Sequence, residues 1–382
     1  MPSTQPRAAH EESMRRASSR LILLRHGQSE WNGASGFGPA RFTGWVDVAL
    51  TPRGEAEAAA AGALLRSQAP PMAVDAAFTS ELRRAAKTAE LCLPGAAVAR
   101  DARLNERHYG ALQGVRKDDP GLLATPLAHS TQTQKPLTAS ELEKIRRSMR
   151  VAPPAMSGTH PHYDAKAPPT ESLADCQRRV LACFDERVAP AVRGGRTVLV
   201  AAHANTLRAL IAALDGVPDA LVPKIFVPNA VPCVYALDGD SLGPLAPRLE
   251  SSSGGSHARW LLSAENYERL AEKIGVSTLA RNIFEAWDAN GDGVLDLDEL
   301  RAGLAQITGD DDVAVAASAG AILAELDEDG DGTISLAEFE ERAEQACRQF
   351  VPSPVGLGDA ATRGYAGPGA VSYTHLTLPT KA

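Results

Sequence analysis

Several features are scarce in this 382-residue chain, and each scarcity excludes a class of protein. No apolar run approaches the length of a membrane-spanning helix, and the N-terminal stretch lacks the apolar segment of a secretory signal. The five cysteines are odd in number and form no Cys-x-x-Cys pair, which argues against a disulfide framework or a zinc site. Aromatic residues make up only 5% of an otherwise ordinary globular composition. We therefore expect a cytoplasmic protein; Arg15 and Arg16 leave organelle import by the leader as an alternative.

Negative charge is concentrated in one segment. Residues 276–347 contain 18 aspartates and glutamates against three arginines, whereas the rest of the chain is net positive. A basic body suits an anionic substrate and an acidic segment suits a cation, while solvated charged surfaces are the alternative for both. The length is too great for one average core, so we expect two domains.

Two apolar runs each end in a histidine. Residues 21–24 precede Arg25, His26 and Gly27, and residues 196–202 precede His203. Continuous apolar runs are typical of buried parallel strands, whose carboxyl ends meet at the edge where open α/β sheets bind ligands. A single histidine after such a run is more often a packed residue, but two favour a catalytic site. We expect Gly27 to let a phosphate approach backbone N–H groups.

The intervening sequence predicts further helices and strands. Thr51 and Pro52 begin a helix that runs towards Arg66, and residues 171–188 and 206–214 are also helical. A second strand is expected at 75–80 and a last one at 231–238, which Pro232 places at a sheet edge.

Three segments carry groups that suit phosphate chemistry. Arg84 lies near the start of a helix at 81–91, which makes an anion site or a solvated basic face. Glu106 lies in the polar loop 103–114 beside Arg107, as an acid/base group or one half of a salt bridge. Residues 116–169 are irregular apart from a helical patch at 138–149, and we expect them to form a lid.

Residues 288–299 and 327–338 both match the calcium loop of an EF-hand. Each has oxygen donors at positions one, three, five, nine and twelve, glycine at six and an apolar residue at eight. The predicted ligands are Asp288, Asn290, Asp292, Val294, Asp296, Glu299, Asp327, Asp329, Asp331, Thr333, Ser335 and Glu338. Leu295 and Ile334 are expected to pair as a small sheet, and a pair that no longer binds calcium is the alternative.

Six blocks together resemble the cofactor-dependent phosphoglycerate mutases of the histidine phosphatase superfamily. They are LRHGQSEWN, RFTGW, FTSELRRA, RLNERHYGALQG, the ESL that opens a later helix, and VLVAAHANTLRAL. The resemblance runs from about Leu21 to Asp238 and resumes at 259–274. It implies a three-layer α/β/α fold with a mainly parallel sheet, to which the EF-hand pair adds a small all-α domain.

The resemblance also implies roles for individual residues. His26 would be the nucleophile that becomes phosphorylated, Arg25, Arg84 and His203 would clamp the phosphoryl group, and Glu106 would donate and accept protons. The positions that match substrate-binding residues are Ser29, Asn32, Thr43, Gly44, Arg107, Tyr109, Lys117, Arg146, Arg147 and Asn205.

The implied reaction interconverts 3-phosphoglycerate and 2-phosphoglycerate through a phosphohistidine, with 2,3-bisphosphoglycerate as the phosphoryl primer. No catalytic metal is expected, because the clamp neutralises the phosphoryl oxygens. Arg107, Lys117, Arg146 and Arg147 would form a second ring that suits a substrate with a further anion, which favours a mutase over a phosphatase.

The chain departs from the family pattern in three places. Ala204 replaces the glycine of His-Gly-Asn, and we expect its methyl to crowd the phosphate and lower activity modestly. The segment from Lys117 to Arg146 is longer than usual, and VPNAVP at 227–232 replaces an apolar-Pro-Thr-Gly pattern, which is expected to alter how the substrate is seated.

Two alternatives stay open at this point. One is a phosphatase of the same superfamily that acts on another phosphorylated metabolite. The other is a calcium-responsive binding protein whose mutase domain is inactive through Ala204. We expect phosphoglycerates and calcium as ligands, no nucleic acid or membrane partner, and a homodimer or homotetramer as the assembly.

The expected domain plan follows from these motifs. It consists of a disordered leader (1–20), a catalytic domain (21–275) with a flexible insertion or linker (247–258) and an amphipathic helix (262–274), an EF-hand pair (276–350) and a disordered tail (351–382). Residues 371–382 resemble a translated sequencing adapter and are excluded from fold reasoning.

Overall fold

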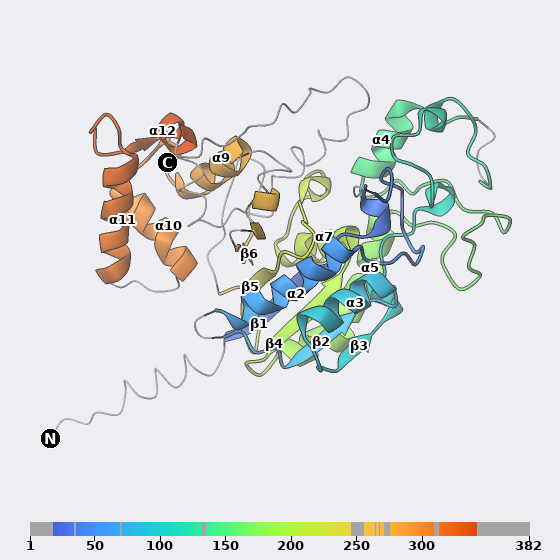
Figure 1. Ribbon diagram of the computed structural model, residues 1–382, viewed down its shortest axis with the longest axis horizontal. Helices are drawn as coiled ribbons and strands as arrows, with labels where there is room; N and C mark the ends of the chain where they lie inside the picture. The colour runs from blue at the N-terminus through green and yellow to red at the C-terminus, as the bar shows by residue number, and fades with distance from the viewer. Residues whose placement is uncertain are drawn as a thin grey trace.

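The computed structural model describes residues 18–33, 36–68, 71–131, 135–245, 256–263, 265–266, 268–270, 276–308 and 313–341. Within them, a six-stranded sheet in the order β3-β2-β4-β1-β5-β6 forms the centre of the larger domain, and a two-stranded sheet joins β7 and β8 (Figure 1). No helix in this described part is long and apolar enough to cross a membrane.

The central sheet is mainly parallel, as predicted. Its inner strands β1, β4 and β2 pair in parallel, as do β2 and β3, whereas β5 and β6 run antiparallel to their neighbours. The strands are β1 (Ser18–Arg25), β2 (Ala76–Thr79), β3 (Val98–Arg100), β4 (Thr197–Ala202), β5 (Cys233–Asp238) and β6 (Arg259–Trp260).

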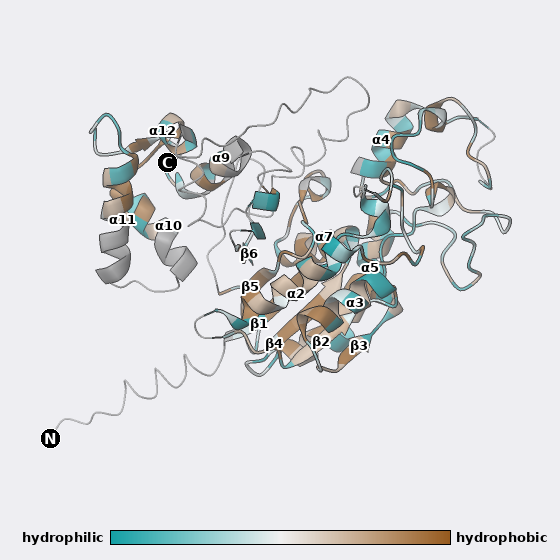
Figure 2. Cartoon of the chain, in the orientation of Figure 1, coloured by the Kyte–Doolittle hydropathy of each residue, from teal (hydrophilic) through white to brown (hydrophobic). Residues whose placement is uncertain are grey.

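Helices cover both faces of the sheet, because successive strand residues point to opposite sides. Leu21 and Leu23 pack towards α5 (Leu173–Cys183), α6 (Ala189–Val192) and α7 (Ala204–Leu214). Ile22 and Leu24 pack towards α2 (Pro52–Arg66) and α3 (Arg83–Cys92), which Figure 1 shows in front of the sheet. The apolar strands form the brown centre of Figure 2. The predicted three-layer α/β/α architecture is therefore confirmed.

Several element boundaries differ from the prediction. β1 begins at Ser18, inside the expected leader, because Ser18 pairs with Asp238 of β5. β5 is neither the last strand nor an edge strand, since β6 pairs with its first two residues, and Pro232 precedes the strand instead of lying in it. The expected helix at 171–188 is divided, because a π-helical turn at Phe184–Val188 follows α5.

The segment expected to be a lid has a small core of its own. Thr138 caps α4 (Ala139–Arg147) by accepting the N–H of Glu141, and Ile145 of this helix packs against Phe42, Leu112 and Leu122. Figure 1 shows α4 beyond the carboxyl ends of the central strands. This packing fixes the segment beside the sheet edge.

The last residues of the expected linker, 256–258, lie in the described part of the chain and are packed. Ser256 and Ala258 are fully buried, although they fall within the predicted flexible stretch. The reason is Asp215 at the end of α7, whose carboxylate accepts hydrogen bonds from the Ser256 hydroxyl (2.6 Å) and the His257 N–H (2.9 Å). Residues 265–266 and 268–270 are helical, and the rest of the helix expected at 262–274 lies largely outside the described residues.

Four helices form the EF-hand pair, drawn in orange and red in Figure 1. Phe284 and Phe339 contact each other edge to face inside it, with ring centroids 5.7 Å apart. Its buried apolar residues belong to the same cluster as Trp260 and Leu270 of the larger domain. The elements are α9 (Val276–Trp287), β7 (Val294–Leu295), α10 (Leu297–Thr308), α11 (Val313–Leu326), β8 (Ile334–Ser335) and α12 (Leu336–Glu341).

Ala230 generates a prediction about stability. This fully buried residue has a φ of 49°, a left-handed conformation that costs an L-residue roughly 1–2 kcal/mol. Ala230→Gly should raise the free energy of unfolding by about 1 kcal/mol, after the greater unfolded-state entropy of glycine is subtracted. Urea unfolding measures this change.

Ala189→Gly is the matched control, because Ala189 is buried but has a φ of −56°. It should lower the free energy of unfolding by about 0.5–1 kcal/mol. Equal destabilisation by the two substitutions would contradict the proposed strain at Ala230.

Candidate active site and calcium-binding loops

The carboxyl ends of β1 and β4 bring the two predicted histidines together. The strands are neighbours, with Arg25 opposite Ala202, and the His26 N–H donates to the Ala202 carbonyl at 3.0 Å. The imidazole centroids of His26 and His203 lie 5.2 Å apart. Parallel pairing therefore places both rings at one sheet edge, as the sequence predicted.

His26 is held in its neutral form. Its Nδ1 lies 2.7 Å from the Gly27 carbonyl oxygen, which can only accept, so Nδ1 carries the proton and Nε2 keeps a lone pair. Burial, and then the charges of Arg84 and Arg25, hold the His26 pKa well below its usual value. A neutral imidazole with a free Nε2 lone pair is the form that attacks phosphorus.

Gly27 has a different role from the one expected. Its N–H donates to Thr88 Oγ1 at 3.0 Å and is therefore already engaged. A Cβ at this position would fall 2.1 Å from the Gly54 carbonyl oxygen. Gly27 thus lets the first turn of α2 pack against the loop and does not make room for a phosphate.

His203 offers a hydrogen-bond donor from the opposite side. Ser80 Oγ accepts the Leu82 N–H and lies 2.8 Å from His203 Nε2, so the Ser80 hydroxyl can donate to that nitrogen. Nδ1 would then carry the proton; it is buried and has no hydrogen-bond partner in the described structure. Burial and Arg84 lower the His203 pKa well below its usual value. The ring is suited to donate to a phosphoryl oxygen.

Backbone carbonyls fix the two clamp arginines. Arg84 is 1% exposed and donates to the carbonyls of Gly44 and Val46, each at 2.8 Å, and burial lowers its pKa to about 10. Gly44 has a φ of 54°, and a Cβ there would fall 2.0 Å from Gln113 Oε1. Arg25 donates to the Val227 carbonyl at 2.8 Å.

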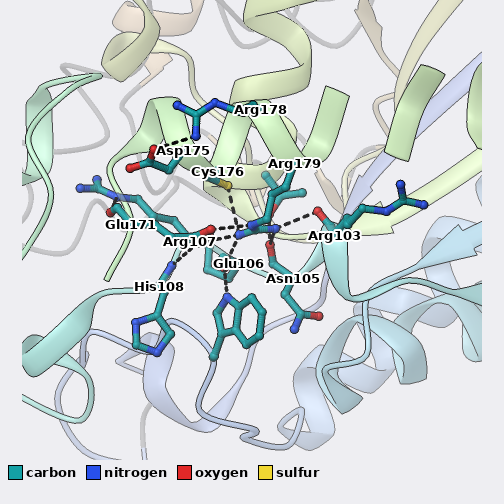
Figure 3. Close-up of polar contacts among 12 residues, drawn as sticks. Arg103, Asn105, Glu106, Arg107, His108, Glu171, Asp175, Cys176, Arg178 and Arg179 are labelled. Atoms are coloured by element: carbon teal, nitrogen blue, oxygen red, sulfur yellow. Dashed lines mark hydrogen bonds and ion pairs between the residues drawn. The ribbon is translucent and has the colours of Figure 1, made fainter. Parts of the chain in front are cut away.

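Glu106 is buried, and its carboxylate lies beside the first residues of α7. Its Oε1 accepts the N–H groups of Arg107 (2.8 Å) and Asn205 (3.2 Å). Arg179 of α5 supports this loop by donating to the carbonyls of Arg103, Asn105 and Glu106, as Figure 3 shows. Sequence reasoning missed Arg179.

The support of Arg179 comes from the ESL block. Glu171 forms an ion pair with Arg179 at 2.7 Å, and both side chains are largely buried. The Glu171 carboxylate also accepts the His108 N–H at 2.8 Å. The block was noted only for the family resemblance, although an acidic residue eight positions before a helical arginine was its visible signal.

These groups surround a cavity of about 210 Å³. Most of the predicted residues line it: Arg25, His26, Asn32, Thr43, Gly44, Arg84, Glu106, Tyr109, Lys117, Arg146 and Asn205. The long segment between Lys117 and Arg146 therefore still brings both cations to the site. Glu106 is the acidic member of the lining, so the cavity is strongly positive.

Three predicted residues whose side chains are described, Ser29, His203 and Arg107, do not line the cavity. Ser29 instead contacts Asn32 Oδ1 through its N–H (2.9 Å) and hydroxyl (3.0 Å), which orients Asn32. The His203 ring lies beside the ring of His26, with their centroids 5.2 Å apart, but does not line the cavity. The side chain of Arg147 lies outside the described residues.

Arg107 is the third residue with a different placement. Its side chain is 1% exposed and donates to the carbonyls of Ile145 (3.0 Å), Val151 (2.9 Å) and Glu171 (2.9 Å). Because its guanidinium is directed at these carbonyls, Arg107 holds the segment that carries Arg146 and does not belong to the second ring around the cavity.

Other polar residues of the cavity were missed by the sequence analysis. Arg208 lies three positions after Asn205 on α7, a spacing that puts both on one helix face, and its Nη1 donates to Asn205 Oδ1 at 2.5 Å. Arg41 begins the RFTGW block and also lines the cavity. Asn229, from the VPNAVP segment, donates to the His26 carbonyl at 2.8 Å.

Ala204 is accommodated without backbone strain. It is the first residue of α7 and lines the cavity. The described non-glycine residues with positive φ are His129, Ala230 and Leu242, so Ala204 is not in the left-handed region. The methyl narrows the cavity without forcing a change in φ.

Three predicted ligands of the second calcium loop lie close together. Carboxylate oxygens of Asp327, Asp329 and Glu338 lie within 4.8 Å of one another. Hydrogen bonds from Ser335 and Glu328 lower the Glu338 pKa to about 2, which keeps its carboxylate ionised. These oxygen donors suit a hard cation such as calcium.

The first loop shares the backbone geometry of the second. Gly293 and Gly332, at position six, have φ values of 88° and 89°. Leu295 pairs with Ile334, so the predicted small sheet is confirmed. In the first loop, Glu299 Oε1 accepts hydrogen bonds from the N–H groups of Ala289 (2.9 Å) and Asn290 (3.3 Å). The position-twelve carboxylate therefore lies against the first residues of the loop.

Comparison with known proteins agrees with this geometry. The histidine phosphatase superfamily (branch 1) matches residues 21–151 and 136–245. The chain belongs to the histidine phosphatase superfamily. Residues 278–344 match the EF-hand domain pair, so an EF-hand pair follows the superfamily domain.

The similar sequences include phosphoglycerate mutases. The 2,3-bisphosphoglycerate-dependent phosphoglycerate mutase of Corynebacterium diphtheriae is 39% identical over 257 residues, which cover 63% of this chain and 96% of that protein. The protein of the same name from Novosphingobium aromaticivorans is 42% identical over 234 residues, covering 58% and 94%. A solved mycobacterial glucosyl-3-phosphoglycerate phosphatase is 28% identical, with a TM-score of 0.43 over 57% of this chain and 90% of that one.

The lowered pKa of Lys117 predicts that anion binding in the cavity depends on pH. Burial, and then the charges of Arg146 and Arg25, lower its pKa to about 8. Its ammonium is therefore present below pH 8 and is lost as the pH rises through this value. Sulfate, which stays doubly charged, should bind roughly up to tenfold more weakly per pH unit above 8 in calorimetric titrations.

Lys117→Arg is the control, because a guanidinium stays charged throughout this range. The variant should show a flat profile between pH 7 and 9. The same loss of affinity in the variant and the natural protein would contradict the assignment to Lys117.

Proposed function

We propose that the superfamily domain is a 2,3-bisphosphoglycerate-dependent phosphoglycerate mutase, which interconverts 3-phosphoglycerate and 2-phosphoglycerate in the cytoplasm. The observation that carries the proposal is the cavity with two tiers of cations. Arg25 and Arg84 lie beside the proposed nucleophile with the neutral His203 next to it, and a second tier of cations also lines the cavity. The free thiols of the four described cysteines support a reducing compartment.

The outer tier differs from the one that sequence predicted. Lys117, Arg146, Arg41 and Arg208 line the cavity, whereas Arg107 does not. Hydrolysis of one phosphate requires only the inner clamp. Four further cations suit a ligand with a second anionic group, such as a carboxylate or another phosphate, and therefore favour the mutase.

The residues of the site fit a transfer through His26. Nε2 of His26 forms the bond to phosphorus while the phosphorus–oxygen bond opposite breaks, and Glu106 gives a proton to the leaving oxygen. In the return step Glu106 takes the proton of the attacking hydroxyl and the nitrogen–phosphorus bond breaks. When bound, 2,3-bisphosphoglycerate supplies the phosphoryl group that primes His26.

We further propose that the EF-hand pair binds two calcium ions. The twelve predicted ligand positions all lie in described residues, and the second loop already converges on a shared point. The described residues of the catalytic site hold no comparable acidic cluster, and their cations suit an anion instead. Assembly as a homodimer or homotetramer stays a prediction.

The nucleophile is tested by labelling. Incubation with 2,3-bisphosphoglycerate carrying labelled phosphate should give an acid-labile, base-stable adduct, because a phosphoramidate hydrolyses in acid. A chase with unlabelled 3-phosphoglycerate should move the label to bisphosphoglycerate. His26→Ala should form no adduct, whereas His162→Ala, outside the cavity, should label normally.

A label that persists in His26→Ala would show that another residue is the nucleophile. A label that forms but leaves only as inorganic phosphate in the chase would overturn the mutase and support a phosphatase.

Calcium binding is tested by calorimetry on the full chain. The natural protein should bind two ions, at affinities typical of sensor loops, about 10⁻⁷ to 10⁻⁵ M. Glu338→Gln removes the position-twelve carboxylate of the second loop and should leave one ion bound. Glu340→Gln is a matched control outside the loop and should keep two; a stoichiometry of zero in the natural protein would refute the proposal.

A further inference from the structure

Glu57 of α2 accepts a hydrogen bond from the loop that carries the proposed nucleophile. Glu57 is 4% exposed, and its Oε2 accepts the Gln28 N–H at 2.8 Å. Its other oxygen, Oε1, lies 2.9 Å from Arg269 Nη1 and 3.2 Å from Arg53 Nε. The position of this carboxylate therefore affects residues 26–28, which we call the nucleophile loop.

A second support of the nucleophile loop also contacts Arg269. Asn229 Nδ2 donates to the carbonyls of His26 (2.8 Å) and Gly27 (3.4 Å). The Asn229 carbonyl in turn accepts a hydrogen bond from Arg269 Nη1 at 3.4 Å. Arg269 thus contacts both Glu57 and Asn229, two residues that form hydrogen bonds with the nucleophile loop.

Arg269 differs from Arg53 in burial and in its place along the chain. The Arg269 side chain is 14% exposed, and that of Arg53 is 55% exposed. A partly buried ion pair is less screened by water than an exposed one, so Arg269 dominates the interaction with Glu57. Arg269 also donates to Asn266 Oδ1 in its own helical segment.

The same segment precedes the EF-hand pair in the chain. Arg269 precedes the first residue of α9 by seven positions. Leu270, beside it, is 2% exposed and belongs to one apolar cluster with Ala280, Ile283 and Phe284 of α9. A shift of α9 would therefore reach Arg269 through this apolar cluster.

We propose that Arg269 is a positioning residue that couples calcium binding in the EF-hand pair to the nucleophile loop, through its contacts with Glu57 and Asn229. The inference rests on the proposed role of His26 as the phosphoryl acceptor. Calcium would favour one arrangement of α9, and its effect on the loop equals the difference in calcium affinity between the two arrangements. By linkage, an anion bound at His26 must change calcium affinity by the same factor.

Orthovanadate is the probe, because it requires only the phosphoryl clamp and not mutase turnover. Calcium affinity is measured by calorimetry with and without saturating vanadate, and vanadate affinity is measured in calcium and in chelator. In the natural protein the two ratios should agree and should be about fivefold or more. A ratio of one would overturn the coupling.

Variants then test whether Arg269 carries the coupling. Arg269→Met should bring the ratio close to one, and Arg269→Lys, which keeps one charge, should restore part of it. Arg53→Ala removes the other cation on Glu57 and should keep the full ratio. An unchanged ratio in Arg269→Met would overturn the assignment; if this variant does not fold, a full ratio in Arg269→Lys together with a lost ratio in Arg53→Ala would do so.

The assay separates this inference from the proposed function. A protein that shows the vanadate linkage but forms no 2-phosphoglycerate would retain the coupling and lose the mutase. A protein that is an active mutase with a linkage ratio of one would retain the function and lose the role of Arg269.

Discussion

Parallel pairing of β1 with β4 is the constraint on which the active site depends. It fixes His26 beside His203 through backbone hydrogen bonds, so the relative position of the two rings does not rely on flexible side chains. Ser80, at the end of the adjacent β2, then orients His203. Three neighbouring strand ends thus supply the proposed nucleophile, the imidazole proposed to donate a hydrogen bond to the phosphoryl group, and the serine that sets the tautomer of that imidazole.

The active site also depends on positive charge that is buried away from water. Arg84 keeps its guanidinium in a buried position because two carbonyls accept its hydrogen bonds, and its charge helps to keep His26 and His203 neutral. The positive electric field of these charges attracts anions, and it becomes stronger as water leaves the cavity. The neutral state of the two histidines and the attraction of anions to the cavity therefore have one electrostatic origin.

Features that depend on residues close together in the chain could be predicted from the sequence. The cap at Thr51, the apolar runs before His26 and His203, and both calcium loops could be read from neighbouring residues. Contacts between residues far apart in the chain could not be predicted in this way. Gly27 packs against the backbone of α2, and Arg107 donates to three carbonyls that lie between residues 145 and 171. The pairing of β6 with β5 was hidden for the same reason, because two residues give no periodic signal.

We propose that the four outer cations make this site a mutase and not a phosphatase. The most direct measurement is the partition of product when 3-phosphoglycerate is supplied with catalytic 2,3-bisphosphoglycerate, followed as 2-phosphoglycerate formed against inorganic phosphate released. The account predicts that isomerisation greatly exceeds release, because the outer cations retain the intermediate bisphosphate until the second transfer. Phosphate release equal to or faster than isomerisation would contradict it.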